Sequence, residues 1–298
     1  MPSGRTLFAV IAAAAGLALA GRADDAAGLL VKQQAAVAAN LKAGQVTLAT
    51  AETADLIVSA PYPAERVAKV AAEVQKAYTA ALRALKSDAK GDPIDGKLAV
   101  YVLADPKAYK VFLLQALKRS PRGKEAVEMD LRGDTPQVVL SAGADARPTE
   151  AGVVAQASRA VAAALLNVKA GTTGDGGLPG WLEAGFGYAV TLRVEGNAAK
   201  LAAHRAKLKT LVQRSQGAAL QVKVATGETP SADADAAAVS LAEYLVYGPG
   251  ADKFPAILTA LKPGEGNETP TIWTAFTAAD WKADEVEVAW RRWVLTGK

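Results

Sequence analysis

Few side chains in this protein could do chemistry. Among its 298 residues there is one histidine, His204, and no cysteine. Catalytic zinc sites use three protein ligands, and structural sites use four that are mostly cysteine or histidine. His204 with scattered carboxylates is a poor ligand set, so the sequence predicts neither a metal site nor a cofactor. Its neighbours are Ala203 and Arg205 in a basic segment, and we therefore expect His204 to be solvated rather than catalytic.

Ser158 is a candidate nucleophile by residue type. A serine nucleophile needs a general base beside it, and the adjacent Arg159 stays protonated. We therefore expect Ser158 to face solvent and Gln156 to cap a small cavity. The alternative interpretation is that Gln156, Ser158 and Glu183 form the polar remnant of a cleft.

Charge limits the kinds of partner. The net charge is +4, and removal of Arg5 and Arg22 with an N-terminal signal would leave the mature chain nearly neutral. This balance predicts no nucleic-acid partner. Five basic residues lie between 198 and 215: Lys200, Arg205, Lys207, Lys209 and Arg214. Such a group is typical of a solvated helix face; the alternative is a surface that binds an acidic partner.

The first 23 residues have the pattern of a secretory signal peptide. Arg5 is followed by an apolar run from Leu7 to Ala20, with small residues for cleavage after Ala20 or Ala23. A membrane-spanning helix needs roughly 20 apolar residues, so this run is short for an uncleaved anchor, which is the alternative. We expect export to the periplasm or the extracellular space, and no transmembrane segment in the mature chain.

Hydrophobic periodicity and turn residues predict an α+β fold. A small mixed β-sheet with helices is expected in the N-terminal half, and helices alone in the C-terminal part, because strands dominate only before residue 141. The expected helices are 24–44, 63–86, one opened by Asp105 and Pro106, 150–167, 179–194, 198–215 and three or four within 231–295; the expected strands are 46–49, 56–59, 98–103, 125–131 and 137–141. Segment 218–230 is ambiguous. We expect the chain to divide into a signal peptide (1–23), an N-terminal helix (24–44), an α+β core (45–195) and a helical C-terminal subdomain (196–298).

One stretch across the expected helix pair 150–167 and 179–194 resembles a known family. Leu178, Pro179, Trp181, Leu182, Gly185 and Tyr188 occupy matching places in the string Leu-Pro-x-Trp-Leu-x-Glu-Gly-x-Ala-x-Tyr of peptidase MA-like, gluzincin-type zinc metallopeptidases. In that family the preceding helix carries His-Glu-x-x-His. Both histidines bind zinc, the glutamate polarises the attacking water, and a glutamate of the second helix supplies the third ligand.

The positions that would carry this chemistry are all replaced. Gln156 stands for the first histidine, Ala157 for the catalytic glutamate, Ala160 for the second histidine and Ala184 for the third ligand. Glu183 lies one residue early, and one residue on a helix is a rotation of about 100°, so we expect its side chain to point away from the former metal position. The resemblance thus implies a zincin-like, gluzincin-like core that has lost its zinc site and its catalysis.

The resemblance implies that the protein is a pseudoenzyme. The remaining groove would be lined by Gln156, Ser158, Trp181, Glu183 and Tyr188, and it would bind a peptide or an envelope protein without cleaving it. Two alternatives stay open: a hydrolase with different, non-zinc chemistry, and a purely structural interaction module. The sequence leaves the oligomeric state undetermined.

Overall fold

The computed structural model describes residues 27–87, 93–120, 127–142, 149–172, 177–215, 232–263 and 270–297, and all that follows concerns these residues. Five strands form one sheet in the order β1-β2-β3-β5-β4. The strands are β1 (Ala49–Glu52), β2 (Leu56–Ala60), β3 (Leu98–Leu103), β4 (Val127–Asp130) and β5 (Gln137–Ser141). The central strands β2, β3 and β5 are parallel, and β1 and β4 run antiparallel to them at the two edges.

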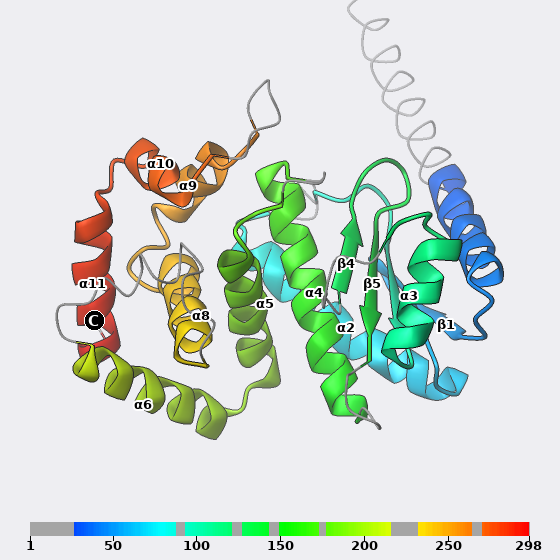
Figure 1. Ribbon diagram of the computed structural model, residues 1–298, viewed down its shortest axis with the longest axis horizontal. Coiled ribbons are helices and arrows are strands. Elements are labelled where there is room, and N and C mark those ends of the chain that lie inside the picture. Colours follow the sequence, from blue (N-terminus) through cyan, green and yellow to red (C-terminus); the bar gives the residue numbers. More distant parts are fainter. Residues whose placement is uncertain are drawn as a thin grey trace, which may run out of the picture.

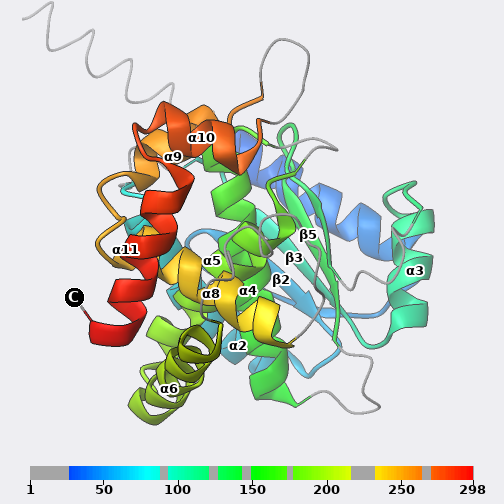
Figure 2. The same ribbon diagram turned by 60° about the vertical axis from the view of Figure 1, so that its left-hand side comes forward.

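Both faces of the sheet are covered, which explains why its central strands are continuous apolar runs. Every residue of β2, β3 and β5 is buried, as expected for parallel strands between two layers. One face packs on α2 (Ala64–Ala84) and α4 (Glu150–Ala170); the other is covered by the helix at 27–43 and by α3 (Pro106–Gln115). Figure 2 shows the helix at 27–43 and α3 on one side of the sheet and α4 on the other.

The helix at 27–43 belongs to this core. Its Gln33 is buried, donates from Nε2 to the carbonyls of Asp95 and Asp134, and accepts from the backbone N–H of Lys97 at 2.8 Å. About two turns further on, Asn40 donates to the hydroxyl of Tyr101. These bonds fix the helix to the loops and to the central strand beneath it.

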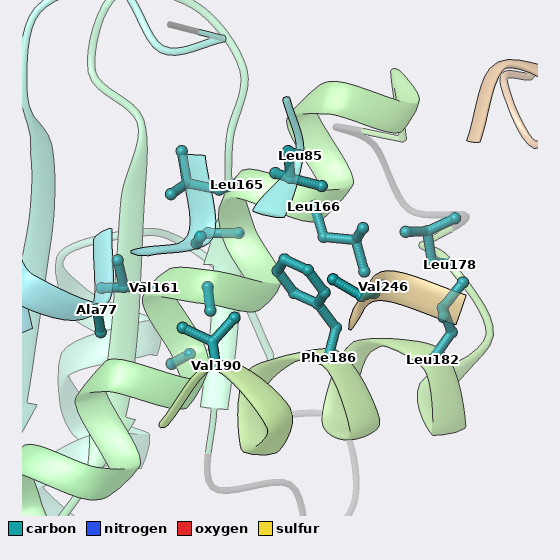
Figure 3. Close-up of a cluster of buried hydrophobic side chains, with 14 of the residues drawn as sticks. Ala77, Leu85, Val161, Leu165, Leu166, Leu178, Leu182, Phe186, Val190 and Val246 are labelled. Carbon is teal, nitrogen blue, oxygen red and sulfur yellow. The ribbon is translucent and has the colours of Figure 1, made fainter. Parts of the chain in front are cut away.

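Helix α5 (Gly180–Glu195) packs between α4 and α8 (Ala232–Tyr247), on the side of α4 away from the sheet. Leu182, Phe186 and Val190 recur at helical spacing and are fully buried against Leu166 and Val246 (Figure 3). A side chain of this size gains roughly 1.5–3 kcal/mol on burial, so this stripe is the main reason that α5 is held there.

The remaining helices extend the fold away from the sheet (Figure 1). They are α6 (Ala198–Arg214), α9 (Phe254–Ala260), α10 (Ile272–Ala278) and α11 (Ala283–Thr296). Fully buried Trp290 of α11 donates from its indole N–H to Ser240 of α8 at 3.1 Å. One continuous cluster of buried side chains runs from the sheet to these helices.

Helix α4 is the one helix in the described ranges that is long and apolar enough to cross a membrane. Of its apolar window, 61% is buried inside the fold. The core helix of a protein without membrane spans has the same composition, so the length and hydropathy of α4 are accounted for by its position between α2 and α5.

The α+β class predicted from the sequence is confirmed, with a small mixed sheet in the N-terminal half and helices in the C-terminal part. Four helices follow residue 231, within the three or four expected. The predicted bounds 46–49 of the first strand were wrong, because β1 runs from Ala49 to Glu52. Val46 and Leu48 are loop residues that pack on the face of the sheet covered by the helix at 27–43 and α3. The expected signal at 1–23 and segment 218–230 lie outside the described residues.

Candidate functional site

The four positions of the replaced zinc motif differ in their exposure. Ala157 and Ala160 are 0% and 4% exposed and contribute to the main core, whereas Ala184 on α5 is exposed. Gln156 is half-buried. Within the described residues, no group of three His, Cys, Asp or Glu side chains lies close enough to hold a metal ion. Ala157 and Ala160 thus support helix packing.

Helices α4 and α5 approach each other at the level of their backbones. A Cβ added to Gly187 would lie 2.6 Å from the carbonyl oxygen of Arg159, closer than real Cβ contacts. Gly185, half a turn earlier, makes the same kind of approach to α8, where an added Cβ would lie 2.7 Å from the carbonyl oxygen of Ala238. The two glycines therefore let α5 fit between its neighbours.

Glu183 contacts the C-terminal end of α4, far from position 156. Its Oε1 accepts from Nδ2 of Asn167 at 2.7 Å. Asn167 is 3% exposed, and its Oδ1 in turn accepts from the hydroxyl of Thr172 and from the backbone N–H of Leu178. Asn167 lies 11 residues beyond Gln156, which is roughly 16 Å along a helix at 1.5 Å per residue. Glu183 thus helps to close the helix hairpin.

The other expected groove residues are spread over this helix pair. Ser158 is 2% exposed, so the prediction that it faces solvent was wrong; it lies on the side of α4 that packs into the core. Trp181 is half-buried against the core, and its indole N–H is buried without a hydrogen-bond partner. Tyr188 contributes to a different group of residues, in which Arg159 and His204 also take part.

Around Tyr188, cationic and aromatic groups stack. The guanidinium of Arg159 lies 4.5 Å from the centre of the Tyr188 ring, and the His204 ring lies 5.9 Å from it. The prediction of a solvated His204 was wrong, because Tyr188 from the preceding helix covers the ring and leaves its Nε2 buried without a partner. Burial lowers the pKa of His204; Glu243 opposes this shift, and Lys207 and Arg205 add to it.

A polar cluster surrounds the buried carboxylate of Glu243, and we call it the Glu243 cluster: Arg193, Arg205, Glu243 and Tyr247. The Glu243 side chain is 3% exposed, and its Oε1 accepts from Arg193 at 3.0 Å and from Arg205 at 3.3 Å. The Arg193 guanidinium also lies 3.8 Å above the Tyr247 ring. Burial raises the pKa of Tyr247 to about 12, with the charge of Arg193 opposing the shift, so this hydroxyl stays protonated at neutral pH.

The second carboxylate oxygen of Glu243, Oε2, is buried and has no hydrogen-bond partner. Buried polar atoms are nearly always hydrogen-bonded, so an exception in a folded protein calls for a physical reason. A cavity of about 110 Å³ lies beside this residue, between α6, α8 and α11. Its walls are apolar at Leu208, Trp293 and Val294, and polar at Arg205, Ser240 and Glu243.

Chemically, this arrangement fits binding. The Glu243 cluster offers guanidinium donors at the edge of a cavity, and the imidazole of His204 packs against Tyr188. Arg193 and Glu243 are not among the site residues predicted from the sequence. A signal was available, because Glu243 is the only charged residue in the apolar stretch 236–247, and a buried carboxylate needs a cationic partner.

Comparisons with protein-family models, with curated proteins and with solved structures give no match for this chain. The similarity to gluzincin-type peptidases therefore stays a prediction from the sequence.

Proposed function

We propose that the protein is an exported, catalytically inactive, peptidase-like binding protein that engages a peptide or an envelope protein without cleaving it. The observation that carries this proposal is the Glu243 cluster beside a cavity lined by Arg205, Ser240 and Glu243. Such a site can orient a polar ligand through fixed donors and acceptors, which is how specificity is usually achieved in binding pockets.

The side chains at the motif positions support the absence of cleavage. Gln156, Ala157, Ala160 and Ala184 lack the two imidazoles, the general base and the third ligand that zinc-dependent hydrolysis requires. A peptide bound near α5 would thus meet no metal-activated water from these residues. Export is proposed on the N-terminal pattern of Arg5 and the apolar run from Leu7 to Ala20.

The experiment measures binding and cleavage in the same samples. The full chain is expressed with its N-terminal segment, and the purified protein is incubated with a library of random octapeptides, with added zinc or with chelator. Retained peptides and cleavage products are identified by mass spectrometry, and bound zinc is measured in the purified protein. We expect a retained subset of peptides, no cleavage products and no stoichiometric zinc.

Two results would overturn the proposal. Chelator-sensitive cleavage with stoichiometric zinc would make the protein a metallopeptidase. Failure to retain any peptide subset above a heat-denatured control would remove peptide binding. The test variant is Arg193→Met, which weakens the Glu243 cluster. Its matched control is Lys209→Met, which changes an exposed lysine outside the cluster; Arg193→Met should retain fewer peptides than this control.

A further inference from the structure

A second cavity, which shares no residue with the Glu243 cluster, lies beside the ends of α2 and α4. Its volume is about 240 Å³, many times the roughly 10–15 Å³ that a single water molecule needs. Its lining comes from the C-terminal ends of these two helices and from α9 with the residues that flank it. The described residues that line it include three lysines, Lys86, Lys169 and Lys262, and no acidic residue.

The three lysines come to this cavity from separate elements. Lys169 is half-buried in the last turn of α4. Lys262, which follows α9, lies at the same end of α4, because a Cβ added to the C-cap residue Gly171 would lie 3.7 Å from Cγ of Lys262. Figure 2 shows α9 next to one end of α4. Since each ammonium group is carried on a flexible four-carbon stem, all three can turn toward one ligand.

Lys86 occupies a backbone position at which glycine is usual. Its φ is 51°, in the left-handed region that is unfavourable for a residue with a Cβ. Its N–H donates to the carbonyl of Arg83, and the N–H of Ser87 donates to the carbonyl of Leu82. This is the Schellman pattern at the end of a helix, where glycine most often takes this place. A lysine held in an unfavourable conformation indicates a use for its side chain.

The positive charge around this cavity is only partly offset. Within the described ranges, none of the three lysines forms an ion pair. The C-terminal ends of α2 and α4 each carry roughly half a negative charge. These two helix ends therefore offset about one lysine, and about two positive charges are left. A ligand with two negative charges would complete the balance, and a half-buried cation such as Lys169 favours a partner of opposite charge.

We infer that this cavity binds a phosphomonoester dianion that carries a small apolar group. A phosphoryl group has three acceptor oxygens and a charge of about −1.5 to −2 at neutral pH, which suits three ammonium groups that act as compact point charges. A carboxylate is matched better by the planar fork of arginine, and the described lining residues include no arginine. Ala84, Ala251 and Pro255 are at least partly exposed and offer an apolar wall to the ester group.

The test follows the backbone amide signals of the full chain labelled with ¹⁵N-phenylalanine, which has five phenylalanines. Phe254 lines the cavity, and Phe112, buried on the opposite face of the sheet from α4, is the internal control. Monobutyl phosphate is compared with butanesulfonate and butylammonium at about pH 8, where the phosphomonoester is a dianion. We expect saturable movement of the Phe254 signal with monobutyl phosphate. Butanesulfonate, which has one negative charge fewer, should bind at least about tenfold more weakly, and butylammonium should give no response.

Two lysine variants separate ligand binding from a structural role. Lys169→Met removes the half-buried cation and should weaken binding of monobutyl phosphate at least about tenfold. Its matched control, Lys209→Met, changes an exposed lysine of α6 and should leave the affinity unchanged. Lys86→Gly removes a cation together with the unfavourable positive φ, so it should weaken binding while Tm stays equal or rises. A lysine that only stabilised the end of α2 would give a lower Tm on removal.

An unmoved Phe254 signal, equal binding of the phosphate ester and the sulfonate, or an unchanged affinity in Lys169→Met would overturn the inference. Sedimentation with phosphatidylcholine vesicles, with and without phosphatidic acid, distinguishes the two sources of such a phosphate. Sedimentation that depends on phosphatidic acid and on Lys169 would assign the cavity to a lipid headgroup, and its absence would assign the cavity to a soluble ester; both agree with the inference. Because the cavity shares no residue with the Glu243 cluster, its failure would leave the proposed function standing.

Discussion

Replacing Gly187 by Ala tests the backbone contact between α4 and α5. The added Cβ would lie 2.6 Å from the carbonyl oxygen of Arg159, and 3.1 Å from its carbonyl carbon and its Cα. Backbone atoms of a helix cannot rotate away, and α4 is held on its other side by α2. Overpacking costs about 1–3 kcal/mol, and a rigid neighbour favours the upper half of that range.

A gain in helix propensity opposes this cost. Ala is better than Gly in a helix interior by about 1 kcal/mol, so the net loss of unfolding free energy should be about 1–2 kcal/mol. For a domain of this size each kcal/mol lowers Tm by about 2–4 °C, which predicts a Tm about 2–8 °C below that of the wild type. Gly180→Ala is the matched control. It lies in the same helix, is exposed, and has no atom within 4 Å of the added Cβ, so it should stabilise by about 0.4–1 kcal/mol.

The measurement is urea unfolding followed by tryptophan fluorescence, with thermal unfolding as the second readout. The two substitutions should move the midpoint in opposite directions with the same denaturant slope. An unchanged or raised midpoint for Gly187→Ala would mean that α4 and α5 can separate without loss, and the close approach of their backbones would then not hold the hairpin together.

Further predictions concern buried polar groups, each measured as the change in unfolding free energy. Asn167→Ala removes a buried amide with four hydrogen bonds and should cost about 2–4 kcal/mol; a loss below about 0.5 kcal/mol would contradict its role in closing the hairpin. Arg193→Met should cost about 1–2 kcal/mol because it removes the closer cation from buried Glu243. Arg205→Met should cost less than about 1 kcal/mol because Arg205 is more exposed. A larger loss of unfolding free energy for Arg205→Met than for Arg193→Met would refute this view of the cluster. Burial lowers the pKa of His204 below its ordinary value of 6.5, so the unfolded chain binds the proton first as the pH falls and stability is lost below about pH 6.5. His204→Phe should reduce that loss between about pH 7.5 and pH 5, and an identical pH dependence in both proteins would exclude His204 as its source.

The elements that could be predicted are those whose signals are local. The run Leu98–Leu103 is a continuous apolar stretch of strand length, and β3 has the expected bounds. Asp105 caps α3 by accepting from the backbone N–H groups of Lys107 and Ala108, with Pro106 in the first turn. Such caps depend only on neighbouring residues, so they can be predicted from a single sequence.

The sheet order and the polar cluster depend on contacts between distant parts of the chain. β3 pairs with β5 and not with β4, although β4 comes first, and nothing local encodes that choice. Arg193 and Glu243 are 50 residues apart, so their pairing follows from the packing of α5 on α8. The exposure of His204 was predicted from its basic neighbours, but Tyr188 from another helix decides it.

The string that resembles the gluzincin-type peptidases can be explained by packing alone. Leu178 and Leu182 are 5% and 0% exposed in the core, Gly185 permits the approach to α8, and Tyr188 stacks on Arg159. A helix that must fit between two others selects this pattern of leucines, small residues and an aromatic side chain whether or not a zinc site ever accompanied it. The residues that carry the proposed binding site, Arg205 and Glu243, lie outside the string. Substitutions in the string therefore test folding, and the proposed binding is tested by substitutions in the Glu243 cluster.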